Sequence, residues 1–159
     1  MPQYKRPESV LVVVYTPELK ALIIERSDFK DAWQSVTGSL EDDETPRETA
    51  VRELREELGI EASRYELQDW GIVNVWEIFE IWRHRYAPDV TENTEHVFGL
   101  LVPETFEPTL APREHVGWLW RDCHVAAEAV FSPSNAEALR ILPEMAVKFG
   151  ATMITQGNA

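Results

Sequence analysis

Three glutamates that share one face of a predicted helix are the residues of this chain best suited to chemistry. Glu53, Glu56 and Glu57 fall on one arc when residues 45–59 are drawn as a helix at about 100° per residue. Glu53 and Glu57 are four residues apart, and like charges at this spacing cost a helix about 0.2–0.5 kcal/mol. Arg52 precedes Glu56 by four residues, but no basic residue holds that spacing to the other two glutamates. Carboxylate oxygens grouped in this way suit a hard divalent cation such as Mg²⁺ or Mn²⁺.

A charged, solvated helix face is the alternative explanation of the same pattern. The limits of the helix are well marked, because Thr45 and Glu48 form a T-x-x-E capping box and Pro46 occupies the first turn. Gly59 stands where a left-handed residue would end the helix. The apolar stripe beside the glutamates comprises Ala50, Val51, Leu54 and Leu58. The pattern therefore predicts an amphipathic helix with an acidic edge.

The segment around this helix, GSLEDDETPRETAVRELREELGI at residues 38–60, resembles the Nudix box. The matching positions are Gly38, Glu44, Arg52, Glu53, Leu54, Glu56, Glu57, Gly59 and Ile60, at the spacing of the box. Nudix hydrolases cleave diphosphate linkages with a divalent metal held by the box glutamates. The resemblance implies that Glu53, Glu56 and Glu57 are metal ligands and that one of them acts as general base. It also implies that Glu114 is a metal ligand, since these enzymes often use a further metal-linked glutamate from outside the box.

Beyond the box, the chain resembles the branch of the family that hydrolyses a pterin triphosphate in folate synthesis. The resemblance extends from Tyr4 to about Leu139 and is carried by the segments YKRPESVLVVVY, WQSVTGSLEDDET, RHRYAPDVTENTE and SPSNAEAL. It implies that Glu53, Glu57 and Glu114 hold magnesium. The residues that it implies at the substrate are Lys5, Arg26, Thr37, Trp76, Glu77, Ile78, Phe79 and Ser132.

Basic and aromatic residues offer partners for the two ends of such a substrate. Lys5 and Arg26 are of the types that bind phosphate, although ordinary surface charge would explain each of them singly. His84, between Arg83 and Arg85, is of interest only for that placement. The aromatic residues that could stack on a flat heterocycle are Trp33, Trp70, Trp76, Phe79 and Trp82. Packing in the core is the alternative role for each of them.

Composition narrows the class of protein. A length of 159 residues fits one domain, expected at residues 1–150, with a frayed tail at 151–159. The net charge of −13 argues against general nucleic-acid binding, and it requires cations to mediate the approach of a phosphate chain. The single cysteine, Cys123, excludes a disulfide framework and is expected to be a buried thiol. With no apolar run of membrane-spanning length and no signal-peptide core, we expect a soluble, cytoplasmic protein.

The order of predicted elements favours an α/β sandwich with a mixed sheet over a doubly wound fold. The Nudix resemblance implies the same α/β/α sandwich. The predicted strands span residues 10–15, 21–26, 33–37, 67–75, 76–86, 95–102 and 115–120, with the first two as a hairpin and a turn or bulge between residues 75 and 76. The predicted helices after the box helix span residues 125–130 and 132–149, the second kinked at Pro143.

These observations together predict an Mg²⁺-dependent enzyme, with Mn²⁺ as a possible substitute. The expected reaction is hydrolysis of dihydroneopterin triphosphate to the monophosphate and pyrophosphate. The alternatives are a general pyrophosphohydrolase acting on dATP or a damaged nucleotide, and a ligand-binding module without catalysis. We expect a small-molecule triphosphate as the only partner, with no nucleic acid or membrane, and a monomer or small homo-oligomer. The identity of the base, the number of metal ions and the phosphorus attacked are left open by the sequence.

Overall fold

The computed structural model describes the backbone of residues 3–157 and the side chains of residues 3–150. The strands are β1 (Glu8–Tyr15), β2 (Lys20–Arg26), β3 (Trp33–Gln34), β4 (Val36–Ser39), β5 (Glu66–Glu77), β6 (Glu92–Leu101) and β7 (His115–Asp122). The helices are α1 (Pro46–Leu58), α2 (Cys123–Ala129), α3 (Pro133–Arg140) and α4 (Leu142–Gly157), with 3₁₀ helices η1 (Ala62–Arg64) and η2 (Glu80–Arg85). In this part of the chain, no helix is long and apolar enough to cross a membrane.

The seven strands form one mixed sheet around β1. β1 pairs with β6 in parallel and with β2 and β4 antiparallel, β5 pairs antiparallel with β6, and β7 pairs antiparallel with β2. The strand order is β3-β2-β1-β6-β5, with β4 and β7 joined to β1 and β2 off this path. The mixed sheet predicted from the sequence is therefore confirmed, as is the hairpin of the first two strands.

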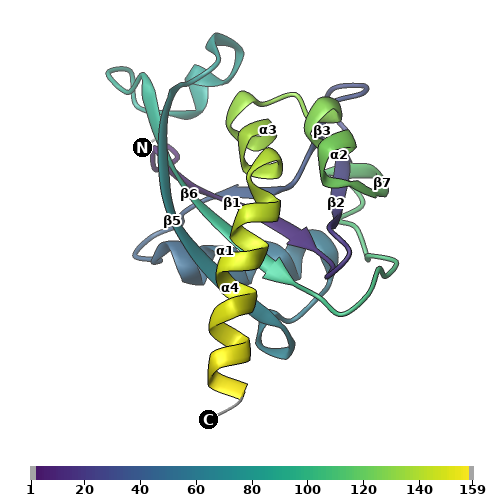
Figure 1. Cartoon of the computed structure of the whole chain (residues 1–159). Coiled ribbons are helices and arrows are strands. Elements are labelled where there is room, and N and C mark those ends of the chain that lie inside the picture. The colour runs from purple at the N-terminus through teal and green to yellow at the C-terminus, as the bar shows by residue number, and fades with distance from the viewer. Residues whose placement is uncertain (1–2, 158–159) are drawn as a thin grey trace.

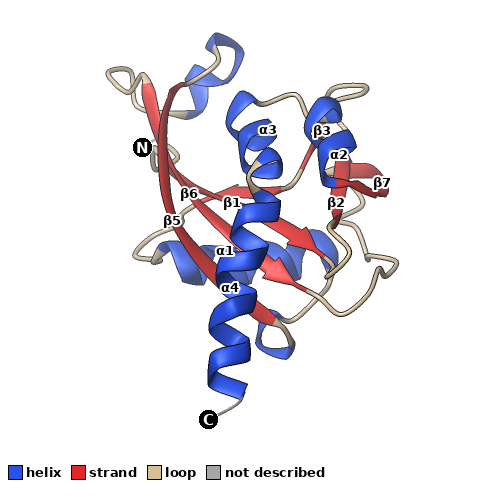
Figure 2. Cartoon of the chain, in the orientation of Figure 1, coloured by secondary structure: helices blue, strands red, loops and turns tan. Residues whose placement is uncertain are grey.

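Helices cover both faces of the sheet, as Figures 1 and 2 show, with α4 crossing one face and α1 on the other. Alternate residues of β1 explain this, because successive side chains of a strand point to opposite faces. The side chains of Leu11, Val13 and Tyr15 pack in a core with residues of α2, α3 and α4. Those of Val10, Val12 and Val14 pack in a second core with Ala50, Leu54 and Leu58 of α1. The expected α/β/α sandwich is confirmed.

The ends of α1 follow the predicted capping pattern. The Glu48 N–H donates to the Thr45 hydroxyl (3.2 Å), and the Thr45 N–H donates to the Glu48 carboxylate (3.0 Å). Gly59 ends the helix in the left-handed conformation with φ of 71°. Because its start, its end and its buried stripe are all fixed, α1 can hold its glutamates in one place against the sheet.

Three predicted elements differ from the structure. Residues 76–86 do not form a separate strand: β5 continues through a bulge at Gly71 (φ 70°) to Glu77, whose partner Glu92 begins β6. With no strand opposite them, residues 80–85 turn into η2. The single strand predicted at 33–37 is divided, because Gln34 pairs with β2 and Val36 pairs with β1.

The long C-terminal helix is also divided rather than kinked. Helix α3 ends at Arg140, and α4 begins at Leu142. Pro143 lies in the first turn of α4, where the missing N–H of proline breaks no hydrogen bond. Helix α4 continues to Gly157, and residues 158–159 lie outside the described part of the chain. The domain limit at residue 150 and the frayed tail remain predictions.

Candidate active site

One large cleft, about 1060 Å³ in volume, brings together residues that are far apart in the sequence. Its walls come from the N-terminal segment, the β2–β3 loop, β4, α1, η2, the segment before β7 and the start of α3. The expected site residues that line it are Lys5, Arg26, Thr37, Glu53, Glu56, Glu57, Trp76, Glu77, Phe79, Glu114 and Ser132. Ile78 does not line the described cleft, because its side chain is buried (2% exposed). The structure therefore gathers every other predicted site residue around one space.

The acidic edge of α1 is partly buried against β4. Glu53 and Glu57 are 8% and 5% exposed, whereas Glu56 is exposed. Gly38 of β4 makes this close approach possible, since a Cβ atom at that position would overlap the Glu53 carboxylate. Two glutamates therefore lie in the wall of the cleft, and the third lies at its edge.

Arg52 organises this edge and forms an ion pair with Glu53. Helical spacing had predicted no basic partner for that glutamate. Its Nη1 lies 2.9 Å from Glu53 Oε1 and 3.1 Å from Glu56 Oε2, and its Nη2 donates to the Ser39 carbonyl (3.0 Å). Its Nε donates to Glu44 (2.7 Å), and this bond holds the pKa of the Glu44 carboxyl at about 2. Helical spacing did not predict this contact, because it pairs residues three or four apart. The long side chain of Arg52 can instead reach the adjacent residue Glu53.

A second group links Glu57 of α1 to the start of β7. Glu57, Glu114 and His115 each offer one ligand atom within 4.8 Å of the others. The Glu114 carbonyl accepts a hydrogen bond from the Ser27 N–H (2.9 Å), which fixes the segment before β7. His115 Nε2 lies 3.9 Å from Glu57 Oε2. His115 was not predicted from the sequence, where its only signal is its place next to Glu114.

Burial is the largest influence on the pKa values of Glu53, Glu57 and His115. Burial raises the pKa of Glu53 to about 7, although Arg52 acts to lower it. Burial, with the Glu53 and Glu114 charges, raises the pKa of Glu57 well above its ordinary value. Burial and the nearby Arg26 lower the pKa of His115 to about 4, so its imidazole is neutral at pH 7. Buried carboxylates in this state favour a neighbouring cation.

Unpaired atoms in the same place fit a divalent metal. Among the described residues, the buried Glu57 Oε2 and His115 Nδ1 have no hydrogen-bond partner. Buried polar atoms nearly always have a hydrogen-bond partner, so two unpaired atoms beside carboxyl groups with raised pKa values fit the binding of a divalent cation. The donors are mainly carboxylate oxygens with one neutral imidazole, a set that suits Mg²⁺ or Mn²⁺.

The raised pKa of Glu53 predicts a pH-dependent stability in the metal-free protein. Its folded pKa of about 7 exceeds the ordinary 4.5, so the folded state binds more protons between these values and loses stability as pH rises through them. Glu53→Gln should therefore stabilise the metal-free protein by an amount that grows across this window to about 2–3 kcal/mol. The comparison must be with the variant, because His115 acts in the opposite sense below pH 6.5. Thermal unfolding with a chelator at several pH values measures the difference, and a pH-independent difference would contradict the assignment.

Residues predicted to contact the substrate line the same cleft as the acidic edge. Arg26 makes a two-point contact with Asp28, with Nε–Oδ1 at 2.8 Å and Nη2–Oδ2 at 2.7 Å. Burial and the charge of Arg85 lower the pKa of the Lys5 amine. The Thr37 hydroxyl donates to the Val10 carbonyl (2.9 Å). Cations thus face the cleft, and the substrate-binding roles of these residues remain predictions.

A third candidate, Ser132, also has a structural role. Its hydroxyl caps α3 by accepting from the Asn135 N–H (3.5 Å). Among the aromatic candidates, Trp70 is buried in the core (3% exposed) and Trp33 packs against that core outside the described cleft, which leaves Trp76, Phe79 and Trp82 at the cleft. His84 does not line the described cleft.

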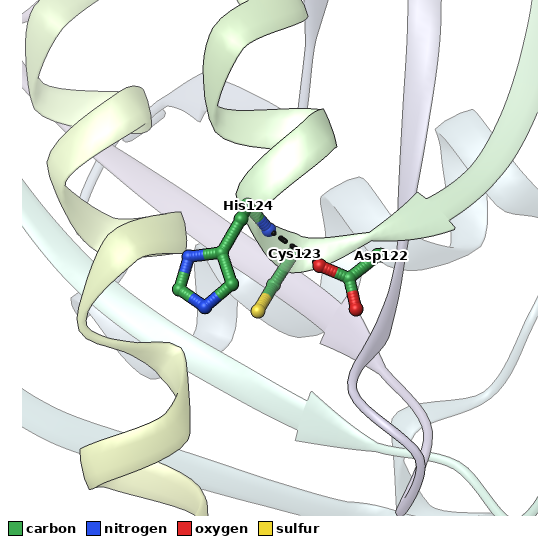
Figure 3. Close-up of side chains that lie close together, drawn as sticks. All are labelled: Asp122, Cys123 and His124. Carbon is green, nitrogen blue, oxygen red and sulfur yellow. Dashed lines mark hydrogen bonds between the residues drawn. The ribbon is translucent and has the colours of Figure 1, made fainter.

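A separate group outside the cleft, Asp122, Cys123 and His124, also places three possible ligand atoms within 4.8 Å (Figure 3). The Asp122 carboxylate caps α2 by accepting from the His124 N–H (3.0 Å). Cys123 is buried, as expected, and burial raises the pKa of its thiol. A protonated thiol is a poor ligand, so this group is explained by the cap and the core.

This chain is similar to known proteins over most of its length. A family model described as the NUDIX domain matches residues 5–142. The dihydroneopterin triphosphate diphosphatase of Haemophilus influenzae is 43% identical over 143 residues, or 88% of this chain and 89% of the relative. The enzyme of the same name from Escherichia coli K12 is 44% identical over 139 residues, or 86% of this chain and 91% of the relative. The solved structure of the E. coli dihydroneopterin triphosphate pyrophosphohydrolase has a TM-score of 0.82 and 42% identity, covering 87% of this chain and 96% of that one.

Proposed function

This chain belongs to the NUDIX domain family, and we propose that it hydrolyses dihydroneopterin triphosphate to dihydroneopterin monophosphate and pyrophosphate. The observation that carries the proposal is the close group of Glu57, Glu114 and His115 beside Glu53, in a cleft that also presents Lys5. Acidic residues for a metal and a basic residue for phosphate are what cleavage of a diphosphate linkage requires. The identity of 43–44% to enzymes named for this substrate supports the choice of pterin.

Nudix hydrolases use a divalent metal, and we propose Mg²⁺ here, with Mn²⁺ as a substitute. Glu53, Glu57 and Glu114 would hold it, and Glu56 is a further candidate at the exposed edge. When bound, the cation would neutralise charge on the phosphate oxygens and make a bound water more acidic. Because Nudix chemistry acts on water and phosphate, the buried thiol of Cys123 has no part in it.

The protein's own groups would position the phosphate chain and move one proton. A box glutamate or Glu114 accepts the proton from the attacking water, and no covalent enzyme intermediate is required. Lys5 and Arg26 bring positive charge to the phosphates in a protein whose net charge is −13. Thr37 and Ser132, with the backbone of residues 76–79, contact the organic end of the substrate. These roles make positioning and charge stabilisation the main sources of catalysis.

Arg26→Ala is expected to raise KM by about 10-fold or more with a smaller change in kcat, since a charge-assisted hydrogen bond contributes about 1.5–3 kcal/mol. Steady-state kinetics of pyrophosphate release measures both constants. Arg64→Ala is the matched control, because Arg64 is exposed on η1 and lies outside the described cleft. An unchanged KM with normal turnover would place Arg26 outside the site.

A general nucleoside triphosphate pyrophosphohydrolase is the second candidate. The CTP pyrophosphohydrolase of E. coli K12 is 29% identical to this chain over 133 residues, and pterin and purine rings present similar edges. Values of kcat/KM for dihydroneopterin triphosphate and dATP, measured with Mg²⁺, decide between the two. We expect at least a 10-fold preference for the pterin, and an equal or greater value for dATP would favour the alternative.

A non-catalytic binding module is the third candidate and predicts no turnover of any triphosphate. The presence of Glu53, Glu56 and Glu57 together argues against it, because a sensor has no need to keep all three. Magnesium-dependent release of pyrophosphate would exclude it. The cytoplasmic location and the monomeric or small-oligomeric state remain predictions.

A further inference from the structure

Four aromatic side chains from three segments gather at the cleft. Phe29, Phe79 and Phe131 all direct ring edges or faces to Trp82, with centroids 5.9, 5.4 and 6.4 Å from it and interplanar angles of 76°, 78° and 70°. They come from the β2–β3 loop, the start of η2 and the α2–α3 connection, which lie together at the top of the view in Figure 1. We call these four residues the aromatic wall.

The aromatic wall remains unusually exposed for a packed cluster. Phe29, Phe79 and Phe131 are 42%, 46% and 38% exposed. Phe79, Trp82 and Phe131 line the cleft itself. Edge-to-face packing holds these rings in place, but it leaves apolar surface in contact with water. Exposed apolar surface inside a cleft of this size is typical of a ligand-binding surface.

Arg26 joins the aromatic wall to the acidic group. Its guanidinium carbon lies 4.8 Å from the centroid of the Trp82 ring, while Asp28 holds its other side. Arg26 also pairs with His115 across β2 and β7 and lines the same cleft as Glu57, which places it near the acidic group as well. The cleft therefore presents carboxylates, then a cation, then aromatic rings. A flat heterocycle carrying a phosphate chain has the matching order of groups.

From this order we propose that Phe131 contacts the heterocycle and determines the preference for ring-bearing substrates, and that Trp82 positions Arg26. The inference rests on the proposed function in one respect, that the ligand is a triphosphate of a flat ring. Stacking on an aromatic side chain tolerates different rings, because each has a π-face. Phe131 therefore favours substrates with a ring over those without one.

The test compares a ring-bearing substrate with a ring-free anion. Phe131→Leu should raise KM for dihydroneopterin triphosphate by about 10-fold, while the inhibition constant of inorganic triphosphate stays within about 2-fold. Trp82→Leu should raise both constants, because Arg26 loses the ring on which it stacks. Phe106→Leu is the matched control, since Phe106 forms an edge-to-face pair with Trp120 (5.4 Å) and does not line the described cleft; it should change neither constant.

Two results would overturn the inference: an unchanged KM in Phe131→Leu, or an equal rise of both constants in that variant. Folding of each variant is checked by thermal unfolding, and the 38% exposure of Phe131 makes leucine tolerable there. Failure of the proposed function gives a different result, because wild-type protein would then leave dihydroneopterin triphosphate intact. The same comparison made with dATP then decides the role of the aromatic wall.

Discussion

Glu57→Gln is expected to lower kcat by about 10²-fold or more, the loss associated with removing a metal ligand or a base. Glu57 is 5% exposed, and it is the residue that joins the acidic edge of α1 to Glu114 and His115. Glutamine keeps the size of the side chain but removes the negative charge. Glu53→Gln should lose activity to a similar extent, because Glu53 faces the same space.

Pyrophosphate release at saturating substrate and Mg²⁺ measures this loss, and titration with Mn²⁺ measures metal affinity independently. Both variants should bind Mn²⁺ more weakly without losing stability, because each removes a buried carboxylate whose pKa is raised. Glu128→Gln, an exposed glutamate of α2, is the control and should change neither quantity. Full activity in Glu53→Gln or Glu57→Gln would remove that residue from the site.

Gly38→Ala is expected to have an effect of the same order on kcat, about 10²-fold, although it changes no chemical group. The added Cβ atom would overlap the Glu53 carboxylate, which Arg52 holds at 2.9 Å and which has little free space around it. Glu53 must therefore move away from its place at the cleft. The reason is close approach rather than backbone conformation, since Gly38 has no positive φ.

Gly117→Ala is the matched control, because a Cβ atom there would meet only ordinary contacts, the nearest at 3.5 Å. The double variant Gly38→Ala with Glu53→Gln should be little worse than Glu53→Gln alone, since both changes disable the same carboxylate. Wild-type kcat and Mn²⁺ affinity in Gly38→Ala would show that Glu53 does not need its present position.

Local sequence signals predicted α1 well, because its capping box and Gly59 act within a few residues. The same signals failed at residues 76–86, where aromatic and β-branched residues favour a strand. The outcome there depends on β6, whose pairing with β5 stops at Glu92. The end of β5 is therefore set by β6, a pairing partner that is distant in the sequence.

The site shows the same division between local and distant contacts. Gly38 and the box glutamates were predicted from fixed spacing, whereas His115 and the pairing of Arg52 with Glu53 were not. Phe29 and Phe131 could not be placed beside Trp82 from the sequence, because only the fold brings the β2–β3 loop and the α2–α3 connection to η2. Fixed spacing predicts residues within one short segment of the chain, and contacts between distant segments follow only from the fold.

Diffraction from crystals soaked in Mn²⁺, with the anomalous signal of the metal recorded, tests the central claim most directly. The claim is that Glu53, Glu57 and Glu114 hold a divalent cation where phosphates are cleaved. We predict an anomalous peak at bonding distance, about 2.0–2.3 Å, from oxygen atoms of these carboxylates. A peak found only elsewhere, such as at Asp122, Cys123 and His124, with the three glutamates apart and without metal, would contradict the account.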